Sequence, residues 1–311
     1  MKKNTVTLIA LIAIAVLLAG VSGCKKEEAA EGAPAEEKVV TVGAKNFTEQ
    51  YIAGNMVSLL LQENGFKVKE QFGTGSKITR DGLTTGQTDL YPEYTGTAWT
   101  VYLQHEEQVN DPVELYNKVK KEDLEKNNIV WLDRWLLNDT YALAIKKEMA
   151  DEYGTSISEL GEVVNADPKR LKFGIDQEFY ERPDGFFKMA EFYGFDVPKG
   201  QVKTMDVGLS YEALNRDQVD VAMVFSTDGL IRKFDLLVLE DDKQFFPVYN
   251  IAVTIRKDVL DKYPEIEEII KPLATLLDDV TMQNLNYRVD AEGLPAEVVA
   301  KEFLKENGLI E

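Results

Sequence analysis

The feature of this sequence that most restricts its fold is an order of strand and helix that occurs twice. The first occurrence consists of predicted strands and helices in alternation, at residues 39–43, 49–64, 66–72, 77–85 and 89–91. The second occurrence follows the same order, at residues 171–174, 186–193, near Gln201, before Arg216 and from Asp220 onward. Alternation of this kind predicts α/β architecture with parallel sheets and helical crossovers.

Two segments of the repeat also match residue by residue. LTTGQTDLYPEYTGT from Leu83 and LNRDQVDVAMVFSTD from Leu214 share Leu, Gln and Asp at one constant offset, which aligns Tyr94 with Phe225. In open α/β sheets, ligands bind outside the carboxyl ends of the strands. We therefore expect one aromatic side chain from each copy to face a shared cleft. The alternative is that both rings are ordinary core residues.

The chain is longer than one hydrophobic core usually serves, so we expect two lobes. The predicted boundaries are 39–143 for the first part of lobe 1, 144–248 for lobe 2 and 249–311 for a return to lobe 1. The returning segment contains a predicted strand and three predicted helices, at 248–255, 264–277, 281–287 and 295–307. Two crossover strands between lobes make a hinge, with a ligand cleft between the lobes.

The first 23 residues have the pattern of a lipoprotein signal peptide. Lys2 and Lys3 precede an apolar run that is short for a membrane span, and the run ends in VSGC, where Cys24 is the only cysteine of the chain. Lipidation of Cys24 would anchor the protein to a bacterial membrane on its periplasmic or cell-surface side. Residues 24–38 are rich in Glu, Ala and Gly and predict a flexible tether. The alternative is an ordinary secretory signal with an incidental thiol.

Composition argues against several function classes. The formal net charge of −19 excludes nucleic acid as a partner, because phosphate binding requires a basic surface. The single histidine, His105, lies in a polar stretch with no second His or Cys to complete a metal site, so we expect a surface histidine, no metal and no cofactor. No HExxH, GxSxG or phosphate-loop motif is present, and GTGSK from Gly73 lacks the Walker spacing. A hydrolase with paired carboxylates stays formally open.

Five segments resemble the substrate-binding proteins of osmoprotectant ABC importers, the glycine betaine, carnitine and choline binding family. They are GAKNFTEQYI from Gly43, DLYPEYTGTAW from Asp89, NDTYALA from Asn138, EFYERPDG from Glu178 and VFSTDG from Val224. The resemblance, which covers the chain from about Val39, implies a type II periplasmic-binding-protein-like fold and no enzymatic activity. It also implies a monomer that works with permease and ATPase subunits. A ligand-sensing surface protein with the same fold is the alternative function.

The resemblance also implies a binding site. In that family a cage of aromatic rings surrounds the trimethylammonium group. The matching positions here are Tyr94, Tyr141, Phe225 and Tyr249, with the backbone carbonyl of Asp139 near the methyl groups. A quaternary ammonium has no N–H to donate, so aromatic faces recognise its charge through cation–π attraction. Phe225 stands where the family usually has Tyr, which keeps the π face and removes a hydroxyl.

For a ligand carboxylate, the family's polar and cationic positions match Lys45, Thr97 and Arg182. Charge-assisted bonds from Lys and Arg would favour betaine-like zwitterions over choline, with a choline-selective binder as the alternative. Each residue also has a structural interpretation: Tyr141 as strand packing, Lys45 as a solvated charge, and Arg182 as the partner of a nearby acidic residue.

Overall fold

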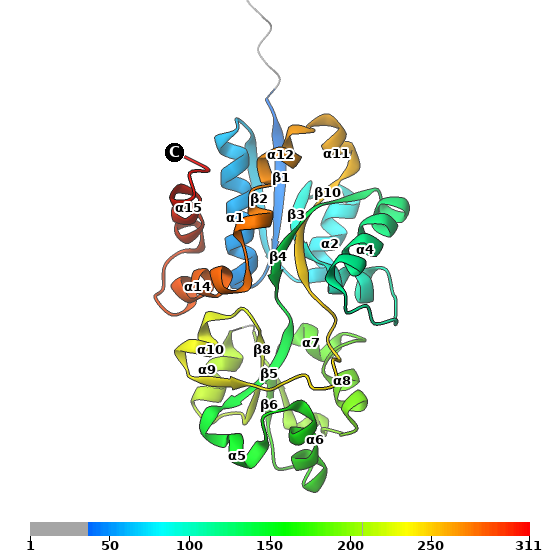
Figure 1. Cartoon of the computed structure of the whole chain (residues 1–311), viewed down its shortest axis with the longest axis vertical. Helices are drawn as coiled ribbons and strands as arrows, with labels where there is room; N and C mark the ends of the chain where they lie inside the picture. The colour runs from blue at the N-terminus through cyan, green and yellow to red at the C-terminus, as the bar shows by residue number, and fades with distance from the viewer. Residues whose placement is uncertain (1–36, 207) are drawn as a thin grey trace, which may run out of the picture. The chain divides into compact units, whose positions relative to one another are not determined.

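The computed structural model describes residues 37–206 and 208–311, which form one compact unit with two lobes (Figure 1). The predicted signal peptide, the anchor Cys24 and nearly all of the predicted tether lie outside the described residues. At the start of the described part, Lys38 Nζ lies 2.6 Å from Glu265 Oε1. None of the helices in 37–206 and 208–311 is both long enough and apolar enough to span a membrane.

Each lobe is built on a five-stranded sheet covered by helices. Lobe 1 has the strand order β2-β1-β3-β10-β4, with β2 (Lys67–Thr74), β1 (Val39–Lys45), β3 (Leu90–Tyr94), β10 (Asn250–Arg256) and β4 (Ile129–Asn138). Lobe 2 has the order β7-β6-β8-β5-β9, with β7 (Val202–Thr204), β6 (Phe173–Ile175), β8 (Val221–Phe225), β5 (Tyr141–Lys146) and β9 (Leu236–Val238). The predicted α/β two-lobed class is therefore confirmed.

The sheets are mixed, which corrects the expectation of parallel sheets. Strand β1 is parallel to β2 and β3, and β6 is parallel to β7 and β8, as predicted. Strand β10 is antiparallel to β3 and β4, and β5 is antiparallel to β8 and β9. These two strands follow the crossings between lobes, so each enters its sheet at the cleft and runs away from it.

The helices of lobe 1 differ widely in length, from three residues in α3 to 16 residues in α1 and α4. They are α1 (Thr48–Glu63), α2 (Ser76–Thr85), α3 (Thr95–Thr97), α4 (Pro112–Asn127), α11 (Lys257–Lys262), α12 (Glu265–Ile270), α13 (Leu273–Leu276), α14 (Asp279–Asp290) and α15 (Ala296–Glu306). A π-helical turn, Ala98–Tyr102, continues α3. Pro272, which has no N–H to donate, stands between α12 and α13, where the sequence predicted one helix.

Lobe 2 has shorter helices, and local capping chemistry explains several of their ends. They are α5 (Ala150–Tyr153), α6 (Ile157–Ala166), α7 (Gln177–Glu181), α8 (Phe186–Tyr193), α9 (Leu209–Asn215) and α10 (Gly229–Lys233), with 3-10 turns at Lys147–Met149 and Lys199–Gln201. Ser156 and Glu159 form a reciprocal capping box at the start of α6. Gly194, with φ of 81°, ends α8 in the left-handed region.

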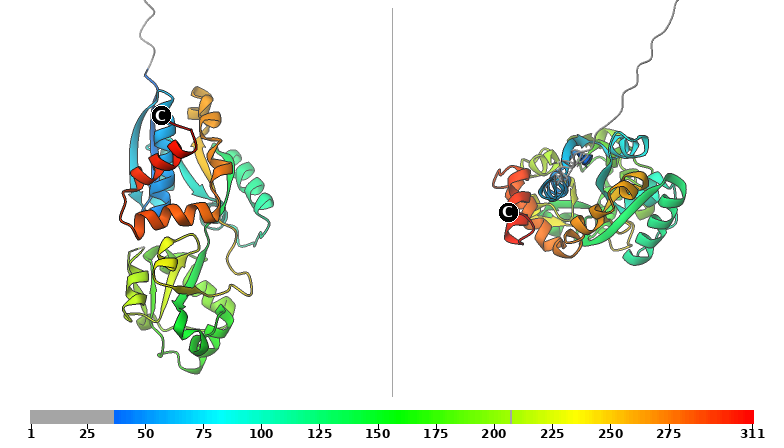
Figure 2. Two further views of the ribbon diagram at one scale, coloured as in Figure 1. Left: turned by 60° about the vertical axis from the view of Figure 1, so that its left-hand side comes forward. Right: turned by 90° about the horizontal axis from the view of Figure 1, so that it is seen from above.

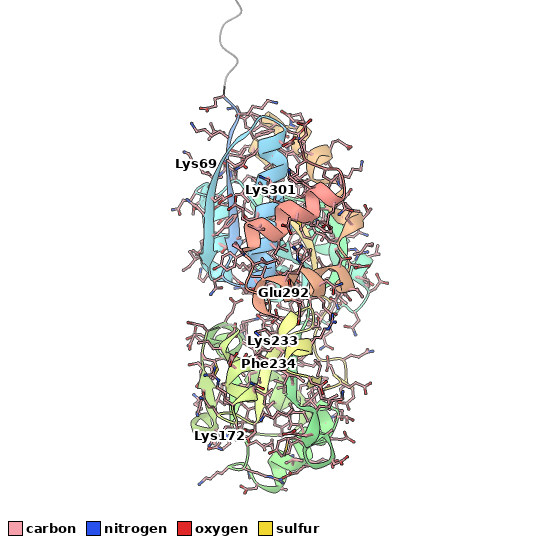
Figure 3. All side chains as sticks on the ribbon, turned by 90° about the vertical axis from the view of Figure 1, so that its left-hand side faces the viewer. Lys69, Lys172, Lys233, Phe234, Glu292 and Lys301 are labelled. Atoms are coloured by element: carbon pink, nitrogen blue, oxygen red, sulfur yellow. The ribbon has the colours of Figure 1, made fainter. Side chains whose placement is uncertain are left out.

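The C-terminal helices cover lobe 1, as the sequence predicted. Helices α14 and α15 pack against α1, and Figure 2 shows them beside α1 on the same lobe. The surface carries many charged side chains; Lys69, Lys172 and Lys301 are exposed and project outward in Figure 3.

The chain crosses between the sheets twice, and the two crossings are bonded to each other. The first crossing lies between β4 and β5, and the second lies between β9 and β10 (Figure 1). The amide of Asp139 donates to the carbonyl of Tyr249 at 3.2 Å, and the amide of Tyr249 donates to Asn138 Oδ1 at 2.6 Å. Strand β5 pairs with β8 from Tyr141 onward, so the second sheet begins slightly before the predicted lobe boundary at 143.

His105 is less exposed than its polar sequence context suggested. Its ring stacks on Trp99 with centroids 3.7 Å apart, and Nε2 lies 2.8 Å from a carboxylate oxygen of Glu122. Within 37–206 and 208–311, no three His, Cys, Asp or Glu side chains form a group that could hold a metal ion.

Candidate ligand-binding site

A cavity lies where the carboxyl ends of the parallel strands of the two lobes meet. Its volume is about 30 Å³, which by the usual criterion for buried water is room for about two water molecules. The lining comes from both lobes: Lys45, Asn46, Phe47, Ser76, Tyr94, Thr97, Asp139, Tyr141, Asp176, Glu178, Phe225 and Tyr249. Seven of the eight residues predicted for the site are among them; Arg182 is the exception.

The four predicted cage rings all lie at strand ends and are all buried. Tyr94 ends β3, Phe225 ends β8, Tyr141 begins β5 and Tyr249 directly precedes β10. The ring of Tyr141 lies 5.1 Å from that of Phe225 and 5.7 Å, edge-on, from that of Tyr249. The aligned pair Tyr94 and Phe225 thus lines one cavity, as the repeat predicted. The starts of β5 and β10 bring the rings of Tyr141 and Tyr249 to the same cavity.

A fifth ring, which sequence reasoning missed, occupies part of the same space. Phe47 stacks on Tyr94 with centroids 6.0 Å apart and on Phe225 with centroids 5.0 Å apart, so it stands between rings of opposite lobes. Its position is the loop between β1 and α1, and its side chain is only partly buried. The sequence could have indicated this ring, because Phe47 lies two residues after the predicted site residue Lys45 in the KNFT loop.

Lys45 is not a solvated charge but a buried ion-pair partner. Its Nζ lies 2.5 Å from Glu93 Oε1 and 4.9 Å from the centre of the Tyr94 ring. Glu93 also accepts hydrogen bonds from the Tyr91 hydroxyl at 2.5 Å and from the amide of Tyr94 at 2.6 Å. The lysine therefore enters the site with its charge already balanced by a carboxylate.

Arg182 is also paired within the protein, with Asp184, a nearby acidic residue of the kind that its structural interpretation predicted. Its Nε and Nη2 donate to the two carboxylate oxygens of Asp184 at 2.9 and 2.7 Å. The same guanidinium lies over the ring of Tyr141, 5.2 Å from its centre, and Nη1 donates to Thr97 Oγ1 at 3.3 Å. Burial opposes ionisation of Asp184, but the Arg182 charge holds the pKa of Asp184 below its ordinary value. Arg182 thus contacts three residues that line the cavity, Thr97, Tyr141 and Glu178, without lining the cavity itself.

Three acidic residues that line the cavity complete its electrostatics. Burial raises the pKa of Asp176 to about 6 and raises that of Asp139 well above its ordinary value. Burial also acts against the charge of Glu178, yet Lys45 and Arg182 together lower the pKa of Glu178. With both cations already paired, the cavity offers aromatic faces and carboxylates, a lining that suits a cationic group.

Direct hydrogen bonds hold the two lobes against each other across the cavity. Thr100 Oγ1 of lobe 1 donates to Asp184 Oδ2 of lobe 2 at 2.6 Å, and the Ser76 amide donates to Glu178 Oε2 at 3.3 Å. Gln108 Nε2 donates to the carbonyl of Phe245 at 2.8 Å. The described conformation is therefore a closed one, which explains the small volume of the cavity.

Comparison with known proteins agrees with this arrangement. Residues 38–306 match the family described as the substrate-binding domain of ABC-type glycine betaine transport systems, OpuAC. The chain belongs to this family. Its members are substrate-binding subunits of ABC importers rather than enzymes, and they act outside the cytoplasm with permease and ATPase partners.

Relatives of known name match over most of the chain. The glycine-betaine-binding protein of Pseudomonas aeruginosa is 40% identical over 89% of this chain and 90% of its own length. The carnitine transport binding protein OpuCC of Listeria monocytogenes is 32% identical, with 88% of each chain covered. The ergothioneine transport permease/ergothioneine binding protein EgtU of Helicobacter pylori is 36% identical over 88% of this chain, but the match spans only 48% of that protein.

Solved structures agree in fold. A glycine betaine/carnitine/choline ABC transporter structure matches with a TM-score of 0.70 and 33% identity, over 88% of this chain and 100% of that chain. The lactococcal OpuAC in its closed, glycine-betaine-bound conformation matches with a TM-score of 0.64 at 17% identity, over 88% of this chain and 97% of that chain, which shows the shared fold.

Proposed function

We propose that the cavity binds the trimethylammonium group of a small quaternary ammonium compound, for import by an ABC transporter. The observation that supports this most directly is the convergence of Tyr94, Tyr141, Phe225 and Tyr249 on one cavity from both lobes. Each ring contributes roughly 0.5 to 2 kcal/mol of cation–π attraction, depending on how completely water is excluded. Hydrated cations such as Na⁺ would lose their water here in exchange for few oxygen ligands, so the rings favour organic cations.

Binding requires the site to enlarge. A cavity of about 30 Å³ is too small for a trimethylammonium group with its three methyl groups. Phe47 covers the faces that Tyr94 and Phe225 turn toward each other, and it lies in a loop rather than in a strand. We therefore propose that the ligand displaces the Phe47 ring when the lobes open and close again.

The ligand we favour is a betaine-like zwitterion. Lys45, Thr97 and Arg182 would hold its carboxylate, with Arg182 reaching the ligand by exchanging part of its pairing with Asp184. Three relatives are named for glycine betaine, carnitine and ergothioneine, all of which are such zwitterions. For a ligand of about eight heavy atoms, micromolar affinity of about −8 kcal/mol is within reach.

A choline-selective site is the second candidate, and one observation favours it. Both cations near the cavity are already paired, Lys45 with Glu93 and Arg182 with Asp184, while Asp139, Asp176 and Glu178 line the cavity. A ligand with a cation and a neutral hydroxyl would bind there without competing for those ion pairs. The two candidates therefore differ in whether Arg182 changes partner.

The remaining parts of the proposal concern where the protein acts. We propose that Cys24 is lipidated and holds the chain at the outer face of a bacterial membrane, and that the protein delivers its ligand as a monomer. Mass spectrometry of the N-terminal peptide from the native host tests the first statement, since a diacyl modification on Cys24 would support it and a free thiol would refute it. Analytical ultracentrifugation tests the second.

Calorimetric titration with glycine betaine, carnitine, proline betaine, ergothioneine and choline tests the ligand class. Micromolar binding of a carboxylated quaternary amine, with choline weaker, supports both the aromatic cage and the carboxylate clamp. Binding of choline alone would keep the cage and refute the clamp. Absence of binding for all five would refute the proposal and favour the sensory alternative.

A further inference from the structure

A buried glutamate connects the aromatic cage to the other lobe. Glu49 lies in the first turn of α1 in lobe 1, and its side chain is almost completely buried. Oε1 accepts a hydrogen bond from the hydroxyl of the cage residue Tyr94 at 2.7 Å. Oε2 lies 2.6 Å from the hydroxyl of Thr227, which follows β8 in lobe 2. Glu49 is thus a direct link between the lobes behind the cage.

The Thr227 hydroxyl also contacts a second buried carboxylate. Thr227 Oγ1 lies 2.8 Å from Oδ1 of Asp139, the residue at the first crossing between lobes. A hydroxyl has one proton to donate, whereas an ionised carboxylate can only accept. Two ionised carboxylates cannot both be hydrogen-bonded by this one hydroxyl. Both contacts are satisfied only when Glu49 or Asp139 carries a proton and donates it to Thr227.

Acidic side chains around the pair disfavour two negative charges, whereas two hydrogen-bond donors, Asn286 and the Thr227 amide, favour the charged forms. Asp279 and Asn286 of α14 face Glu49, and Asp228 after β8 faces Asp139 and itself accepts the hydroxyl of Tyr211. The backbone amide of Thr227 donates to Asp139 Oδ1 at 3.3 Å. Farther out, Asp290 of α14 accepts from Thr48 and acts on Asp228, while the charge of Lys45 is balanced by Glu93.

Burial and neighbouring negative charge both raise the pKa values of the two carboxyl groups, as a shared proton requires. Burial raises the pKa of Glu49 to about 7. Burial first, and the Glu49 charge second, raise the pKa of Asp139 well above its ordinary value. A proton shared by the two carboxyl groups is therefore stable in the closed form near neutral pH.

We propose that closure of the two lobes takes up one proton, which Glu49 and Asp139 share through the hydroxyl of Thr227. Asp139 and Thr227 lie together beside the paired strands β5 and β8, whereas Glu49 belongs to lobe 1. Opening separates Glu49 from them, so the Thr227 hydroxyl donates to Asp139 alone and no extra proton is needed. Because ligand binding closes the lobes under the proposed function, on which this inference rests, binding also takes up the proton.

The sign of the pH dependence follows from the raised pKa in the closed form. Between the ordinary carboxyl pKa and the raised one, closure binds a proton, so affinity falls as pH rises, by up to about tenfold per pH unit. Above the raised pKa, closure proceeds without a proton, the repulsion between carboxylates is fully present, and affinity levels off at its lower value. Below the ordinary carboxyl pKa, both forms are protonated and affinity is constant.

Calorimetric titration of the full chain with glycine betaine, in two buffers of different ionisation enthalpy at about pH 6, measures the proton directly. We expect the wild type to take up nearly one proton more than Glu49→Gln, whose amide can donate to Thr227 while its carbonyl accepts from Tyr94. Asp139→Asn should lower the uptake by the same amount. The matched control is Glu63→Gln, which removes the same charge from an exposed position on α1 and should leave uptake unchanged.

Equal uptake in wild type and Glu49→Gln, or no uptake in the wild type, would overturn the inference while leaving the proposed function intact. If the wild type binds no glycine betaine, the proposed function fails for that ligand, and infrared spectroscopy of the chain locked closed by an engineered disulfide between the lobes decides the inference. A carboxylic acid C=O band at about pH 6 that is lost in Glu49→Gln and kept in Glu63→Gln would support it. Absence of that band in the wild type would refute it.

Discussion

The ring of Phe47 in lobe 1 stacks on the ring of Phe225 in lobe 2, with centroids 5.0 Å apart and planes at 23°. Phe225 is the position at which the sequence resemblance predicts Tyr in related proteins, and Phe47 lies against its ring and lines the same cavity. The protein therefore places one of its own apolar rings where we propose that a cation binds. In this proposal, the cation of the ligand replaces the ring of Phe47 as the group that packs against the cage rings.

Phe47→Ala tests this exchange. Removing the ring frees the faces of Tyr94 and Phe225, so we expect glycine betaine to bind more tightly by roughly 1 kcal/mol, about the value of one aromatic pair. Titration calorimetry and stopped-flow association rates measure the effect. Weaker binding would instead make Phe47 a wall of the cage that contacts the ligand.

Tyr94→Ala removes a cage ring and should weaken binding by well over about 1 kcal/mol. Tyr94→Phe keeps the π face and loses only the hydroxyl that donates to Glu49, so its loss should be much smaller. Phe192→Ala, at an exposed aromatic position on α8, is the matched control and should bind as the wild type does. Equal affinity in Tyr94→Ala and the control would remove Tyr94 from the site.

Phe225→Tyr adds the hydroxyl that the sequence resemblance predicts for related proteins at this position. The aromatic face is preserved, so affinity for glycine betaine should be equal or higher, as equilibrium titration will show. A loss of more than about tenfold would mean that the packing against Phe47 tolerates no added oxygen.

Replacement of the ion pair Arg182–Asp184 tests the carboxylate clamp. Changing Arg182→Gln together with Asp184→Asn removes both charges of this pair, whereas a single change would leave a buried partner unpaired at a cost of about 3–5 kcal/mol. Glu178, 3.4 Å from Arg182 Nη1, loses that contact in the double variant. We expect glycine betaine to bind more weakly and choline to bind as before. Parallel losses for both ligands would show that the pair stabilises the closed lobes, through Thr97 and Thr100, without selecting the ligand.

Another buried ion pair of lobe 1, Arg80–Asp123, has no residue in the cavity lining, so we expect it to affect stability rather than binding. Asp123 pairs with Arg80 through both guanidinium ends and accepts from Trp131 Nε1 at 2.8 Å. Asp123→Asn should lower the free energy of unfolding by about 3–5 kcal/mol, because Arg80 keeps a buried charge without a full partner. Chemical denaturation measures this loss, and ligand affinity under native conditions should hardly change.

Much of the fold could be predicted from local patterns. The helix predicted at 186–193 is α8 as the structure has it, and the other repeated elements differ by a few residues at their ends. These segments obey local rules of periodicity and capping, which do not depend on distant residues. The antiparallel placement of β5 and β10 was missed, because strand direction depends on which end of the sheet the chain enters after crossing between lobes.

Local patterns and the internal repeat were enough to predict that two α/β lobes bring Tyr94 and Phe225 to strand ends. The family resemblance added Tyr141 and Tyr249. The partners of the charged side chains could be read only from the folded chain: Lys45 with Glu93, Arg182 with Asp184, and Glu49 with Thr227 across the lobes. Such pairs join residues that are far apart in the chain, and their energies depend on distance and burial, which only the folded arrangement of the lobes sets.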